Sequence, residues 1–189
     1  RGDGEVIGAG DWAGMIQVPA FLSEQEAARI VREEAQAWGL HLEGEGEMVI
    51  TGDFPLPAVA YTADYGDTRK TWQGQLQLDG YDEKKVAFEY VSKEDIDQWA
   101  QQAVDGNARV EMYRFYQTAY RLTESMQAQL RDSGAYMGVF YDPGTTRIAQ
   151  NDDTWDEKAY QQAQKEYKIE QLRLQVRDFL DWLAAEGII

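Results

Sequence analysis

The chain has 189 residues, of which 18 are basic and 34 acidic, so its net charge near neutral pH is −16. A field of that sign repels phosphate and disfavours nucleic acids and anionic membranes as partners. The chain has no cysteine and one histidine, His41, which excludes disulfides, thiol catalysis and metal sites built from cysteine or from paired histidines. No apolar run approaches the roughly 20 residues that cross a bilayer, so we expect no membrane span.

The opening stretch RGDGEVIGAGDWAG is rich in glycine and polar residues, which predicts a flexible N-terminal arm over residues 1–20. The sequence begins at Arg1 rather than at methionine, and we therefore expect that a signal peptide, a lipid-attachment leader or a tag has been removed. A removed leader would mean export or attachment through an N-terminal lipid or tether. Residues 21–189 show no internal repeat and no boundary, which predicts a single α/β domain.

Start signals and apolar stripes predict the helices. Ser23 and Glu26 form a capping-box pattern, and Gly39 marks the end of the stripe that follows, whose members are Ala27, Ile30, Val31, Ala35 and Trp38. Thr154 with Glu157 gives the same start signal before the last apolar stripe. The expected helices lie near residues 24–38, 93–104, 116–132 and 155–186.

The stretch Trp72–Ser92 predicts a β-hairpin at the centre of the fold. Glutamines alternate with apolar residues up to Asp79-Gly80, a turn signal, and the return strand 86–91 has the few polar positions of a central strand. The helical pattern that leads into the apolar run 135–141 suggests a crossover that adds this run to the same sheet. We expect an α+β (mixed α/β) fold with one central mixed sheet of about four to five strands that contains the 72–91 hairpin and is flanked by the helices.

Two carboxylates of this hairpin are candidate metal ligands. Asp79 ends one predicted strand and Glu89 lies within the next, in the segment LDGYDEKKVAFEYV. This segment resembles the hairpin of the restriction-endonuclease-like superfamily, in which an Asp precedes Glu-any-Lys on the following strand, and the element order of residues 23–141 is similar to that core. The resemblance implies a divalent-metal-dependent hydrolase or nuclease-like domain in which Asp79 and Glu89 hold Mg²⁺ or Mn²⁺ and serve catalysis. The lysine position is occupied by Val91, which implies a degenerate motif.

Other blocks, among them FLSEQEAARIVREEAQAWGL and LRLQVRDFLDWLAAEGII, resemble those of uncharacterised bacterial exported proteins and lipoproteins. That resemblance implies an extracytoplasmic location and carries no activity. The sequence contains no phosphate loop, dinucleotide fingerprint or nucleophile elbow. The leading interpretation is a non-enzymatic extracytoplasmic binding or structural domain without a cofactor, whose partner is a protein or a small molecule. The alternative is the metal-dependent hydrolase that uses Asp79 and Glu89.

Overall fold

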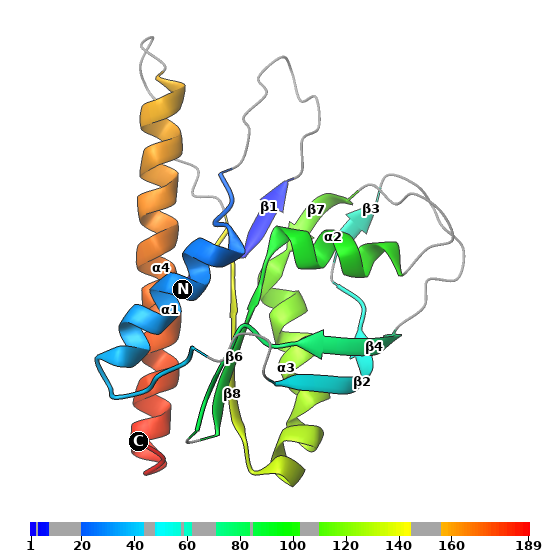
Figure 1. Ribbon diagram of the computed structural model, residues 1–189. Coiled ribbons are helices and arrows are strands. Elements are labelled where there is room, and N and C mark those ends of the chain that lie inside the picture. Colours follow the sequence, from blue (N-terminus) through cyan, green and yellow to red (C-terminus); the bar gives the residue numbers. More distant parts are fainter. Residues whose placement is uncertain are drawn as a thin grey trace.

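A computed structural model of the protein describes residues 1–2, 4–7, 20–43, 48–57, 59–61, 71–83, 85–102, 110–144 and 156–189 (Figure 1). Within these residues the fold is a mixed α+β arrangement, as the sequence predicts. The helices are α1 (Glu24–Gln36), α2 (Lys93–Gln101), α3 (Phe115–Ser133) and α4 (Glu157–Ala185). The strands are β1 (Glu5–Ile7), β2 (Val49–Pro55), β3 (Val59–Tyr61), β4 (Thr71–Gln77), β5 (Gly80–Asp82), β6 (Val86–Val91), β7 (Val110–Arg114) and β8 (Tyr136–Tyr141).

The strands of the described residues form three small sheets, β1-β7-β3, β2-β4 and β5-β6-β8, where we expected one central sheet. The division follows from β4, which pairs antiparallel with β2 from Val49↔Gln77 to Pro55↔Thr71. Along β4 only Leu76 is fully buried, so this ribbon covers the core with one face and leaves the other to solvent.

The predicted 72–91 hairpin is therefore wrong in its pairing. The hairpin of this region joins β5 to β6 through a turn at Lys85, which has a φ of 64°. Asp79-Gly80 is instead the corner at which the chain leaves one sheet and enters the next. A Cβ on Gly80 would lie 2.6 Å from the carbonyl oxygen of Leu42, so this corner requires glycine because another backbone passes close to it.

Strand β6 is the most deeply placed element, because all six of its residues are buried. β8 pairs with it in parallel, from Val86↔Tyr136 to Val91↔Tyr141, which confirms the predicted crossover. Val86, Phe88 and Tyr90 face the α4-side core, which also contains buried residues of α1 and α4. Ala87 and Val91 face the α3-side core.

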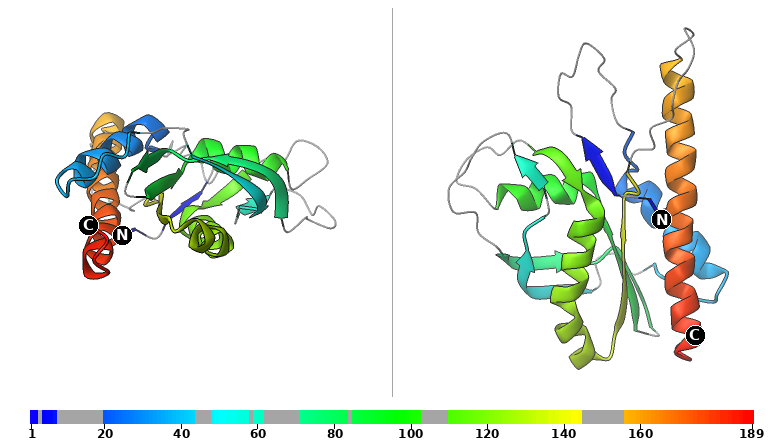
Figure 2. Two further views of the ribbon diagram at one scale, coloured as in Figure 1. Left: turned by 60° about the horizontal axis from the view of Figure 1, so that its bottom comes forward. Right: turned by 180° about the vertical axis from the view of Figure 1, so that it is seen from behind.

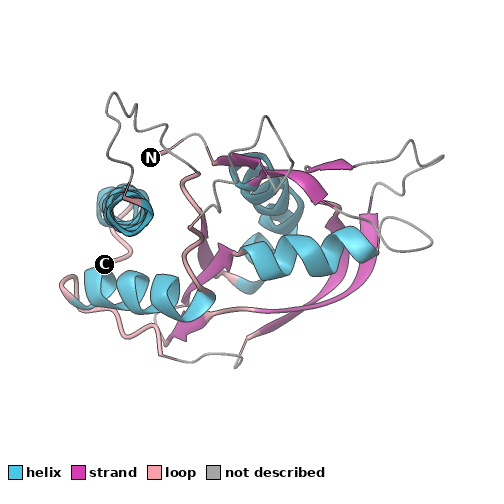
Figure 3. Ribbon diagram, turned by 90° about the horizontal axis from the view of Figure 1, so that it is seen from above, coloured by secondary structure: helices cyan, strands magenta, loops and turns pink. Residues whose placement is uncertain are grey.

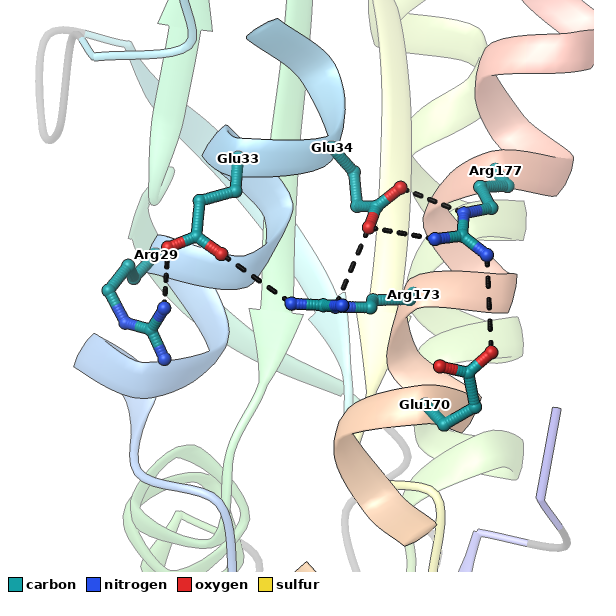
Figure 4. A network of polar contacts seen from close by, with 6 residues as sticks. All are labelled: Arg29, Glu33, Glu34, Glu170, Arg173 and Arg177. Carbon is teal, nitrogen blue, oxygen red and sulfur yellow. Dashed lines mark hydrogen bonds and ion pairs between the residues drawn. The ribbon is translucent and has the colours of Figure 1, made fainter. Parts of the chain in front are cut away.

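Helices α1 and α4 lie together on one side of the β5-β6-β8 sheet (Figures 1 and 3). Surface ion pairs join them: the Arg177 guanidinium donates to both oxygens of Glu34, at 2.8 and 3.1 Å, and Arg173 adds a contact of 3.5 Å to Glu34 (Figure 4). The apolar contact below these pairs comes from one face of α4, which presents Leu172, Val176, Leu180 and Leu183.

The ends of two helices differ from the prediction. Trp38 is exposed rather than part of the buried stripe, because α1 ends at Gln36. The cap of α4 is Asp156, whose carboxylate accepts from the amides of Lys158 and Ala159; the predicted cap, Thr154, lies outside the described residues. The sequence also predicts Ala159 and Ala163 on the buried stripe of α4, but both are exposed, while Gln164 and Lys168 are buried.

Part of the N-terminal segment belongs to the sheet system. Glu5–Ile7 form β1 and pair with β7, and the Arg1 side chain bonds to Asp178 of α4. Residues 8–19 of the predicted arm lie outside the described residues. Across the described helices, none is long and apolar enough to cross a membrane.

Candidate functional site

Asp79 continues the hydrogen bonding of β6 beyond the point where its pairing with β5 ends. β5 is only three residues long and pairs with β6 as far as Phe88. Just past that point the Asp79 amide donates to the Phe88 carbonyl at 3.1 Å, and the Asp79 carboxyl oxygen Oδ2 accepts from the Tyr90 amide at 2.6 Å. The side chain is 8% exposed. It takes the place of the carbonyl of a neighbouring strand, so its first role is to satisfy a buried amide.

Two helix starts bring further carboxylates to Asp79. Glu24 is the first residue of α1, and its side chain lies close enough to Asp79 to raise the pKa of that carboxyl group. Asp95 is the third residue of α2, and its Oδ2 accepts from the Ser92 amide at 2.8 Å and from the Ser92 hydroxyl at 2.7 Å. The positive ends of two helix dipoles therefore face this group of acids and reduce the repulsion within it.

Glu89 lies in the middle of β6 and is 2% exposed. Its neighbours at alternate positions, Ala87 and Val91, belong to the α3-side core, so period-two geometry places the Glu89 side chain against that core. The carboxyl oxygen Oε2 of Glu89 is buried and has no hydrogen-bond partner among the described residues. We refer to Glu24, Asp79, Glu89 and Asp95 as the acid cluster.

Burial is the main cause of the raised pKa values in the acid cluster. It raises the pKa of Asp79 to about 8, against the opposing effect of the Tyr90 amide and with support from the charges of Glu24 and Asp95. Burial raises the pKa of Asp95 to about 6, although the bonds from Ser92 lower it. The pKa of Glu89 is raised well above its ordinary value by burial and then by the Asp79 charge. The environment of Asp79 and Glu89 therefore favours their protonated forms.

The acid cluster contains both residues that the sequence singles out, and it adds Glu24 and Asp95, which sequence reasoning missed. Each added residue carries a recognisable signal, because each belongs to the first turn of a helix that follows a serine cap. The missing signal is tertiary, since nothing local indicates that two helix starts meet at one strand. The position of the motif's lysine is also settled: Val91 is fully buried in the α3-side core.

A divalent ion requires several oxygen ligands at once, all deprotonated or neutral acceptors. Within the described ranges, no group of three or more Asp, Glu or His side chains has the geometry to hold a metal ion. One oxygen of Asp79 is already occupied by the Tyr90 amide. The donors as arranged do not fit a preformed metal site, and a metal-bound form would require Glu89 and Asp79 to lose their protons and Glu24 to reorient.

A second buried polar group lies on the other face of β6. Lys168 of α4 and Asp142, which follows β8, are both fully buried, and their Nζ and Oδ1 atoms are 2.6 Å apart. Asp142 also accepts from the amides of Leu22, at 3.1 Å, and Gly144, at 3.0 Å. The Tyr90 hydroxyl is buried there, and burial, followed by the charge of Asp142, raises the pKa of Tyr90 well above its ordinary value. The stretch Asp142-Pro143-Gly144 predicts a turn but not this pair. The four-residue spacing from Lys168 to Leu172 and Val176 places Lys168 on the buried face of α4.

The surface of the described residues contains at least two depressions. The larger, of about 390 Å³, lies along the outer face of α3, beside Tyr116, Gln117, Tyr120, Arg121 and Glu124. The other, of about 180 Å³, lies beside the end of α1 and the segment that follows it. Neither is lined by Asp79 or Glu89.

No family model matches the chain, and neither the curated proteins nor the solved structures contain one that is significantly similar to it.

Proposed function

We propose that this protein is a non-enzymatic binding or structural domain that acts outside the cytoplasm. The observation that carries the proposal is the 2.6 Å bond from the Tyr90 amide to the Asp79 carboxyl group. A catalytic carboxylate must exchange protons or metal ions with a substrate, whereas this one closes the edge of the most buried strand. Its loss would leave a buried amide without a partner, which makes Asp79 part of the architecture.

Glu89 supports the same proposal. It is almost fully buried, and burial raises its pKa well above the ordinary value, which favours the uncharged form. An uncharged carboxyl group inside an apolar core is a poor metal ligand and has no route to a substrate. The proposed location outside the cytoplasm is supported by the resemblance of the blocks around α1 and α4 to exported bacterial proteins. The partner would be a protein or a small molecule.

Two substitutions at one position test the architectural role. Asp79→Asn keeps an acceptor for the Tyr90 amide and adds a donor toward Glu24, whereas Asp79→Ala removes the acceptor. We expect Asp79→Asn to unfold at the same urea concentration as the original protein or higher at pH 8, and Asp79→Ala to lose about 1–3 kcal/mol because the amide stays unpaired. Equal stability of the two variants would remove the basis of the proposal.

The second candidate is a divalent-metal-dependent hydrolase, and one observation favours it. Glu24 adds a third carboxylate beside Asp79 and Glu89, and the buried Oε2 of Glu89 has no partner in the described part of the chain. Titration with Mn²⁺ or Mg²⁺, followed by thermal unfolding, separates the candidates. A metal-holding cluster predicts a rise in Tm with the original protein that disappears in Asp79→Asn and in Glu89→Gln. The binding or structural role predicts the same Tm with and without the metal.

A further inference from the structure

Strand β8 forms one edge of the β5-β6-β8 sheet. It pairs with β6 over its whole length, and no strand within the described residues pairs with its other side. Figure 2 shows β8 at the margin of this sheet, with α3 and α4 on either side of it. An unpaired strand edge presents a row of backbone donors and acceptors that an extended chain can bind.

Hydrogen bonds identify which residues of β8 point outward. The Tyr141 amide donates to Gln175 Oε1 at 3.1 Å, and the Tyr141 carbonyl accepts from Gln175 Nε2 at 3.2 Å, so the backbone of Tyr141 points away from β6. The Tyr136 amide donates to the Lys85 carbonyl at 2.8 Å, on the β6 side. Because backbone directions alternate along a strand, Met137 and Val139 direct their N–H and C=O groups to the free edge.

At the Tyr141 end of this edge, the side chain of Gln175 takes the place of a neighbouring strand. Its side-chain amide supplies both the acceptor and the donor that the next strand would offer to Tyr141. The rest of the edge has no such cover from the residues that the structure describes. Its sequence, YMGVFY, contains no charge and no proline, the features with which natural edge strands oppose pairing.

Aromatic side chains gather over the lower half of β8 on its α4 side. Trp182 and Tyr136 are 45% and 37% exposed, and their ring centroids are 6.1 Å apart. Phe179 stacks on Trp182 at 5.9 Å. Gly138 allows this arrangement, since a Cβ at that position would lie 2.9 Å from the Phe179 ring. Exposed tryptophan and tyrosine beside an open edge are typical anchors of an interface.

The negative charge around the β8 edge restricts which kind of chain can bind there. Asp181 and Glu186 are exposed on α4 close in sequence to Trp182, and the whole chain carries a net charge of −16. A second copy would bring the same negative charge to the edge, whereas a basic segment would be attracted to it. We propose that the free edge of β8 binds an extended segment of a partner protein, with alternating apolar and basic residues, by strand addition, and that Trp182 and Tyr136 anchor it. This inference rests on the proposed binding role.

A synthetic peptide tests the proposal with the whole chain. The probe is acetyl-Lys-Val-Lys-Val-Lys-Val-Lys-amide, and its control has the same sequence with alternate backbone amides N-methylated, which keeps the charge and removes the donors. Calorimetry at low ionic strength would give at least a roughly tenfold weaker affinity for the methylated peptide. Hydrogen exchange followed by NMR would show the amides of Met137 and Val139 slowed by the probe, while those of Gly138 and Phe140 change little.

Two tryptophan variants form a matched pair. Trp182→Ala is expected to weaken binding of the probe by roughly tenfold, whereas Trp38→Ala, which removes another exposed tryptophan after α1, leaves it unchanged. Equal binding of the methylated peptide, or equal losses in the two variants, would overturn the proposal. So would Met137 and Val139 amides that are already protected in the free protein, because the edge would then be paired by the chain itself or by a second copy; sedimentation distinguishes these two. None of these outcomes alters the Asp79 and metal tests, which concern residues outside β8.

Discussion

The ammonium group of Lys168 lies 2.6 Å from the carboxylate of Asp142, and neither side chain reaches solvent. The pair ties the upper half of α4 to the end of β8. Asp142 also accepts from the amides of Leu22 and Gly144, so the carboxylate holds three chain segments together. A buried ion pair is costly to form, but breaking it by removing one partner costs more, because the other charge stays in an apolar setting.

Lys168→Met should therefore destabilise the protein by about 3–5 kcal/mol, measured by urea unfolding at pH 7. Arg177→Ala, which breaks the exposed contact to Glu34 in Figure 4, is the control and should cost no more than about 1 kcal/mol. The double variant Lys168→Met with Asp142→Asn should lose less than the sum of the single losses. If Lys168→Met unfolds at the same urea concentration as Arg177→Ala, the pair does not hold α4 in place.

The acid cluster makes the free energy of unfolding depend on pH, and the raised pKa values determine the direction of the change. The folded protein raises the pKa of Asp79 to about 8, whereas an unfolded chain has the ordinary value near 4. Between these values the folded state binds more protons than the unfolded state, so the free energy of unfolding falls as the pH rises, by up to about 1.4 kcal/mol per pH unit for one proton. Asp95, with a pKa of about 6, adds to the fall at the acidic end of this range.

Asp79→Asn removes the proton that the raised pKa of Asp79 retains in the folded state between pH 6 and pH 8. We expect urea midpoints measured from pH 5 to pH 9 to fall less steeply for this variant than for the original protein. The groups that face Asp79 are Glu24 of α1, Asp95 of α2 and Glu89 of β6, and the same side chains are present in both proteins. Parallel pH profiles would show that Asp79 is ionised in the folded state at neutral pH.

Glu89 gives an independent check on burial. Glu89→Gln keeps the shape of the side chain and cannot ionise, so its stability relative to the original protein should be greater at pH 8 than at pH 5. Glu94→Gln is the matched control, because Glu94 is exposed in the first turn of the neighbouring helix α2. A pH-dependent gain of equal size in both variants would indicate a general charge effect of the acidic chain instead of the buried site.

The features that local chemistry determines could be predicted from the sequence. The capping box at Ser23 is present with both of its bonds, and the crossover from β6 to β8 follows the order of the patterns along the chain. The strand partners could not be predicted. β4 pairs with β2 rather than with the run after Asp79-Gly80. The sequences of the two strands do not indicate this pairing, because Asp-Gly is compatible with a corner as well as with a hairpin turn.

The residues of the candidate site also separate into those that the sequence identifies and those that only the tertiary structure brings together. Asp79 and Glu89 were identified because they flank one turn region, and they lie together even though the predicted hairpin is wrong. Glu24 joins them only because α1 folds back over β6, a contact between residues far apart in the sequence. A charge at Lys168 is ordinarily a sign of a solvated face, and only the ion pair with Asp142 explains why it is buried.

Gln175 allows the two ends of the β8 edge to be compared. Gln175→Leu removes the donor and the acceptor that serve Tyr141 and leaves the Tyr141 amide without its bond, at a cost of about 1–3 kcal/mol. Hydrogen exchange should accelerate at Tyr141 and stay unchanged at Val139, which points to the same edge but does not depend on Gln175. Gln175→Glu, which keeps the acceptor for the Tyr141 amide, is the control and should retain most of the protection there. If Val139 loses protection together with Tyr141 in Gln175→Leu, the edge is covered along its whole length in the free protein, and strand addition would require that cover to be displaced.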